Sequence, residues 1–137
     1  MSQIVAQPNR TEHAWLVLLG EYARQLGLTA ALNTVPLPQK VRTHRPQTKV
    51  IEFLVAILAG LPHLEDISRA GQPLDQDSAV AVAWQQPGWA DYSGVSRTLQ
   101  GLSLAEAQAI GAVLDTFSQP FIDAAVVAAL STQGRLI

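Results

Sequence analysis

The chain has 137 residues, of which 48% are hydrophobic and 15% charged, so it can bury the core of one domain without covalent staples. This composition excludes a disordered chain, and the absence of cysteine excludes disulfides, thiolate metal sites and a cysteine nucleophile. The net charge is −2, whereas nucleic-acid binders usually carry a basic surplus, so any DNA-binding hypothesis depends on where the charges lie.

Residues 1–10 lack periodicity, which predicts a flexible leader. They also lack the apolar run of a signal peptide, so we expect a cytoplasmic protein. Thr11 is the expected N-cap of a first helix that Gly27 ends, and a second short helix is predicted from Thr29 to Pro36. The apolar stripe of the first helix consists of Trp15, Leu18, Leu19, Tyr22 and Leu26.

Residues 46–60 predict the central helix of an all-helical domain. Pro46 suits the first helical turn because its missing N–H needs no partner there, and Gly60 suits a left-handed C-terminal cap. Apolar residues cover nearly every face between them, which is typical of a helix inside a core. The uncharged run, residues 53–61, is far too short to span a bilayer, so we expect no membrane partner.

The segment before this helix, residues 40–49, shows the clearest charge asymmetry of the chain. No acidic residue occurs between Glu21 and Glu52. The basic residues of the segment are Lys40, Arg42, His44, Arg45 and Lys49. They belong either to a solvated connector or to a strip that contacts phosphates, whose closely spaced negative charges attract cations.

A helix is predicted between Pro62 and Gly71, and Asp75 is the expected N-cap of another. The close carboxylates of these helices are explained by helix-start electrostatics, and neighbours one or two residues apart do not face the same way. We therefore expect no metal site. The sequence also lacks zinc-type histidine pairs, phosphate-cradling loops and nucleophile elbows, so we predict no catalytic residues.

Residues 91–101 predict a short exposed helix with Ser93 as its N-cap and Val95 and Leu99 on its buried side. Its candidate contact residues are Tyr92, Ser93, Ser96, Arg97 and Gln100. Small polar residues with one arginine suit insertion into a DNA major groove, and they equally suit an ordinary surface.

A capping box formed by Ser103 and Glu106 predicts the start of a long helix. Pro120 is expected to break or restart this helix, and residues 121–130 continue the helical pattern. Residues 135–137 look like the start of a strand. The expected fold is all-α: a compact multi-helix domain over residues 11–102 with a helix-turn-helix-like element, followed by a long C-terminal helical connector over residues 103–137.

The order of these features resembles the N-terminal region of bacterial insertion-sequence transposases that have an RNase H-like (DDE) catalytic domain. After the apolar helix that ends in glycine, the matching segments are Leu64-Glu65-Asp66-Ile67, Pro73-Leu74-Asp75 and Tyr92-Ser93-Gly94-Val95-Ser96-Arg97-Thr98-Leu99. The resemblance implies a module that binds double-stranded DNA at terminal inverted repeats. It also implies truncation before the catalytic acids, so that Mg²⁺ is expected only for the missing domain and this chain has no cofactor of its own.

Two hypotheses follow. In the first, the basic residues of segment 40–49 neutralise phosphates, and the candidate contact residues of the short helix approach base edges. This requires both elements on one side of the molecule, with Arg97 exposed. In the second, the chain is a helical interaction or dimerisation module without DNA binding, and the apolar residues within 121–130 contact a partner such as a second copy.

Overall fold

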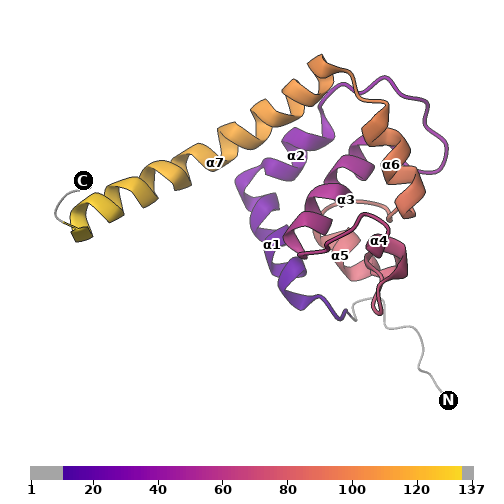
Figure 1. Ribbon diagram of the computed structural model, residues 1–137, viewed down its shortest axis with the longest axis horizontal. Coiled ribbons are helices and arrows are strands. Elements are labelled where there is room, and N and C mark those ends of the chain that lie inside the picture. Colours follow the sequence, from indigo (N-terminus) through magenta and orange to yellow (C-terminus); the bar gives the residue numbers. More distant parts are fainter. Residues whose placement is uncertain (1–10, 134–137) are drawn as a thin grey trace.

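The computed structural model describes residues 11–133, and within this range the chain contains helices and no strand, as predicted. The first helices form a compact body, and the last helix projects from it (Figure 1). In chain order the elements are α1 (Ala14–Leu26), α2 (Leu28–Asn33), α3 (Pro46–Leu58), α4 (Asp66–Arg69), the 3-10 turn η1 (Leu74–Gln76), α5 (Ser78–Ala83), α6 (Tyr92–Gln100) and α7 (Leu104–Gln133). The predicted leader, residues 1–10, and the predicted strand start, residues 135–137, lie outside the described residues.

α3 is the central helix, as the sequence predicts, and it packs against α2 and α6. Its side chains Ile51 and Val55 are completely buried. Pro46 occupies the first turn. Gly60 has a φ of 75°, in the left-handed region that glycine adopts without strain, so both predicted ends of this helix are confirmed.

The buried face of α1 differs from the predicted apolar stripe. The buried residues of α1 are Leu16, Gly20 and Ala23. Leu18, a member of the predicted stripe, is 71% exposed. The reason is a close approach between α1 and α5: a Cβ on Gly20 would lie 2.8 Å from Cδ1 of Trp84, and the Trp84 indole N–H donates to the Leu16 carbonyl at 3.0 Å. The helix therefore turns its small residues inward, because the Trp84 ring needs that space.

Two helices begin with a different cap from the predicted one. Asp77 rather than Asp75 caps α5, and Asp91 rather than Ser93 caps α6; each accepts a backbone N–H of the first helical turn. Asp75 instead accepts a hydrogen bond from the Ser68 hydroxyl at 2.7 Å. In both segments several residues suit the cap, and the tertiary contacts decide between them.

Two other helices differ in extent from the prediction. α1 begins at Ala14 rather than directly after Thr11, whose hydroxyl accepts the His13 N–H at 2.8 Å in a turn before the helix. The helix predicted between Pro62 and Gly71 is reduced to the single turn α4. A turn this short contributes little helical stability by itself and is kept in place by packing, with Ile67 completely buried.

α7 begins at the predicted capping box, in which the Glu106 N–H donates to Ser103 Oγ at 3.1 Å and the Ser103 N–H to Glu106 Oε1 at 2.9 Å. The helix continues through Pro120 without a break, so the predicted interruption is wrong. Its second half projects from the body (Figure 1). The large apolar side chains of this half are exposed. By length and composition, residues 104–132 are also apolar enough to cross a membrane, and none of its most apolar window is buried.

The structure does not confirm the predicted helix-turn-helix-like element. α5 and α6 are separated by residues 84–91, whereas the two helices of that motif are joined by a turn of about 3–4 residues. α6 packs instead across the central helix α3.

Candidate functional site

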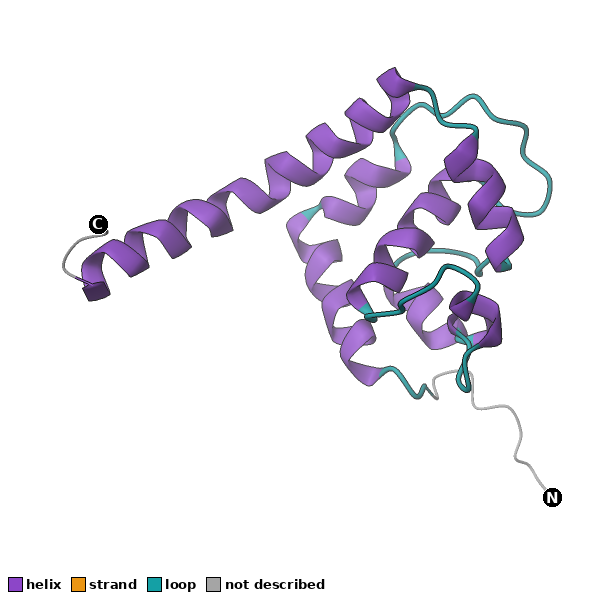
Figure 2. Cartoon of the chain, viewed as in Figure 1, coloured by secondary structure: helices purple, strands orange, loops and turns teal. Residues whose placement is uncertain are grey.

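The loop between α2 and α3, residues 34–45, passes beside α6 (Figure 2). Its first part is anchored by Val35 and Leu37, which are buried against α3. Further along, the Gln39 side-chain amide donates to the Thr98 carbonyl of α6 at 3.0 Å. These contacts fix the course of the loop, so the basic residues that follow lie next to α6.

α6 presents Arg97 to solvent because its opposite side is part of the core. Val95 is completely buried and Thr98 nearly so, while Arg97 is exposed. Asp91 fixes the start of the helix by accepting the Gly94 N–H at 2.9 Å. The arginine is therefore held on a short helix that is anchored at both ends.

Arg97 and part of the basic segment surround one pocket, with a volume of about 280 Å³, where the loop, α3 and α6 meet. The lining residues are Arg42, Thr43, His44, Lys49, Trp89, Ala90, Asp91, Gly94 and Arg97. In the part of the chain that the structure describes, the side chains of Arg42, Lys49 and Arg97 form no hydrogen bond and no ion pair. We call this the basic pocket. Its cations are available to a ligand.

Asp91 is the one carboxylate in the lining of the basic pocket. The hydrogen bond from the Gly94 N–H lowers the pKa of Asp91 below its ordinary value, and the Ser93 hydroxyl and the charges of Arg97 and Lys49 act in the same direction. The carboxylate therefore stays ionised at neutral pH. It offsets one of the positive charges and caps α6 at the same time.

Glu52, one turn after Lys49 on α3, is completely buried and was not among the residues predicted for the site. Its Oε1 accepts the Ala90 N–H at 2.8 Å, which ties α3 to the segment that leads into α6. Burial raises the pKa of Glu52 to about 8, so the carboxyl is mostly protonated at neutral pH. One signal in the sequence was available: Glu52 is the only acidic residue in the apolar helix predicted over residues 46–60.

Two residues of the predicted basic set lie outside the lining of the basic pocket. Lys40 is exposed on the loop. Arg45 donates to the Asn33 carbonyl at 2.8 Å and thereby ties the end of the loop to α2. The structure thus brings Arg42, His44 and Lys49 together with Arg97 and leaves the other two beside them.

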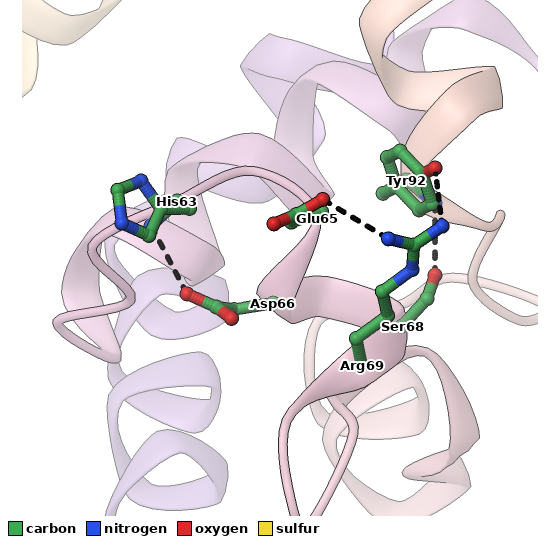
Figure 3. Close-up of polar contacts among 6 residues, drawn as sticks. All are labelled: His63, Glu65, Asp66, Ser68, Arg69 and Tyr92. Atoms are coloured by element: carbon green, nitrogen blue, oxygen red, sulfur yellow. Dashed lines mark hydrogen bonds and ion pairs between the residues drawn. The ribbon is translucent and has the colours of Figure 1, made fainter.

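Among the predicted contact residues of α6, Tyr92 is already engaged by the protein (Figure 3). Its hydroxyl accepts a hydrogen bond from Arg69 at 3.0 Å, and the guanidinium carbon lies 5.0 Å from the ring centroid. Arg69 is held in turn by Glu65 at 3.2 Å. Tyr92 is therefore part of the contact between α4 and α6, and a role in ligand binding would compete with that contact.

Ser93, Ser96 and Gln100, the uncharged contact residues predicted on α6 besides Tyr92, bond within their own helix or its cap. The Ser93 hydroxyl donates to Asp91 Oδ2 at 3.1 Å, and the Gln100 amide donates to Ser96 Oγ at 3.0 Å on the exposed side. Ser96 directly precedes Arg97, and Gln100 follows Arg97 three residues later, so the three side chains form one polar surface on α6.

The cations that line the basic pocket suit anion binding. Within residues 11–133, no group of three or more histidine and acidic side chains is placed to hold a metal ion. No protein-family model, curated protein or solved structure matches this chain.

Proposed function

We propose that this domain binds double-stranded DNA, through a surface made of the basic pocket and the exposed side of α6, without catalysing a reaction itself. One observation supports the proposal above the others: Arg97 lines the same pocket as Arg42 and Lys49, although Arg97 is far from both of them in the sequence. Unpaired cations gathered on one surface are what the phosphate backbone of a duplex attracts. The proposed context, a transposase that recognises the ends of its element, rests on the sequence resemblance.

In this proposal some residues hold the duplex by its phosphates, and others read its base sequence. Arg42, Lys49 and Arg97 neutralise phosphates, with His44 in the same pocket. Ser96, which directly precedes Arg97, and Gln100, one turn after Ser96, are bonded to each other on the exposed side of α6 and are the candidates for contacts with base edges. The sequence suggested a base contact for Arg97, but its place among the other pocket cations favours a phosphate contact.

Fluorescence anisotropy with a labelled duplex of mixed sequence, at about 50 mM and about 200 mM salt, tests the proposal. We expect the logarithm of the binding constant to fall with the logarithm of salt concentration at a slope near −3, and to lose about one unit for each of Arg42→Gln, Lys49→Gln and Arg97→Gln. Arg24→Gln is the matched control, because Arg24 lies on α1 and is paired with Glu21. Binding without a salt slope, or an equal loss in the control, would refute the proposal.

A second candidate function is self-association through α7. The exposed apolar residues of its second half are Phe121, Ile122, Val126, Val127 and Leu130. They add up to a large exposed apolar surface on one helix segment, and such surfaces usually mark contacts with a partner. Light scattering over a range of concentrations tests this candidate. We expect Val127→Lys to shift the protein towards monomer and Val82→Lys, an equally apolar exposed site on α5, to have no effect; a wild type that is monomeric at every concentration rules it out.

A further inference from the structure

We propose that the basic pocket binds the dianion of a phosphate monoester, such as the terminal phosphate of a nucleic-acid end, in preference to the phosphodiesters of a duplex backbone. The pocket overlaps the proposed duplex-binding surface. The two ideas predict different ligands, since an internal phosphodiester carries one negative charge and a monoester carries about −1.5 to −2 at neutral pH.

The charge of the lining favours a dianion. Arg42, Lys49 and Arg97 each contribute one positive charge, and ionised Asp91 removes one, which leaves a surplus of about two. A ligand with two negative charges balances this surplus, whereas a phosphodiester balances half of it. Both oxygens of Asp91 already accept hydrogen bonds, from the Gly94 N–H and the Ser93 hydroxyl, which reduces its repulsion of an anion.

The shape of the pocket favours a compact group. Its volume of about 280 Å³ lies just below the roughly 300–1,000 Å³ of small-molecule sites. The cations come from three elements, so they approach a central anion from different sides.

Gly94 keeps the space beside Lys49 open. A Cβ at this position would lie 3.7 Å from Cε of Lys49 and 3.2 Å from Oδ1 of Asp91, and larger side chains would extend into the same space. The absence of a side chain at Gly94 therefore lets the first turn of α6 lie close to Lys49 of α3, at the edge of the basic pocket.

Titrations of the ¹⁵N-labelled chain, followed by NMR at constant ionic strength, test the proposal. The probes are inorganic phosphate and dimethyl phosphate, which differ in charge and share the tetrahedral phosphorus centre. We expect saturable shifts at Gly94 with inorganic phosphate and much weaker binding of dimethyl phosphate. Lys49→Gln and Arg97→Gln should each weaken phosphate binding by about tenfold, since each removes a charge-assisted contact.

Asp91→Asn is the most informative variant, because asparagine keeps the N-cap and removes the negative charge. We expect it to tighten phosphate binding by about threefold or more, a change that damage to the fold would not produce. Arg24→Gln is again the control and should leave phosphate binding unchanged. Equal binding of the two probes, or weaker phosphate binding by Asp91→Asn, would overturn the proposal.

A second arm uses one duplex with either a 5′-phosphate or a 5′-hydroxyl end. Tighter binding of the phosphorylated duplex identifies a nucleic-acid end as the source of the monoester. If the chain binds inorganic phosphate but no duplex, the monoester site is supported and its ligand is a small phosphorylated molecule. The same result refutes the proposed DNA-binding function. Duplex binding that ignores the 5′ group, in a chain that does not bind inorganic phosphate, refutes the monoester site and leaves the proposed function standing.

Discussion

Glu52→Gln removes the proton-binding group at the centre of α3 and keeps an oxygen that can accept the Ala90 N–H. The carboxyl is completely buried, and its Oε2 has no hydrogen-bond partner among the described residues. Burial of the charged form is the largest cause of its raised pKa, ahead of the opposing hydrogen bond from Ala90 and the repulsion from Asp75 and Asp91. The stability of the fold should therefore depend on the protonation of this one group.

The direction and size of the effect follow from the pKa shift. The pKa of Glu52 rises from 4.5, its ordinary value, to about 8 in the folded protein. Between these values the folded chain holds a proton that the unfolded chain has released, so the free energy of unfolding falls as the pH rises through this window. At about 1.36 kcal/mol per pKa unit, the loss reaches roughly 5 kcal/mol, a large part of the 5–15 kcal/mol that stabilises a typical domain.

Urea unfolding, followed by tryptophan fluorescence and far-ultraviolet circular dichroism at pH of about 5, 7 and 8.5, measures this effect. We expect wild type and Glu52→Gln to differ by about 1 kcal/mol or less at the lowest pH, and the variant to be several kcal/mol more stable at the highest. Glu21→Gln, at an exposed ion pair on α1, controls for the loss of a surface carboxylate. Parallel stability profiles for wild type and Glu52→Gln would refute the reasoning.

Two further substitutions test the packing and the last helix. Gly20→Ala should destabilise the fold by about 1–3 kcal/mol in urea unfolding, because its Cβ would lie 2.8 Å from the Trp84 ring. Gly111→Ala should instead be neutral or slightly stabilising, because the new Cβ would meet no atom within 4 Å outside its own stretch of α7; equal effects would contradict the packing. Pro120→Ala should preserve the helical circular dichroism signal to a higher temperature, because it restores a hydrogen bond to the Thr116 carbonyl and removes a penalty of about 3 kcal/mol within a helix that already continues through this position. An unchanged thermal profile would contradict this.

The surface with the proposed function was only partly predictable from the sequence. The basic segment and the short polar helix were visible as patterns, and Arg97 is exposed as expected. The pattern did not show that Lys40 and Arg45 lie outside the pocket, that Tyr92 is engaged by Arg69, or that Asp91 is part of the lining. Each of these depends on a neighbour that belongs to another element.

The sequence by itself determined the helical class, the ends of α3 at Pro46 and Gly60, and the capping box that starts α7. These signals act within one or two turns of the chain, so their physical cause is contained in a few consecutive residues. Tertiary structure decided which face of α1 is buried, where Glu52 lies and which cations share a pocket. The reason is that burial and electrostatics depend on groups that folding brings together, as when Gln39 of the loop reaches Thr98 of α6.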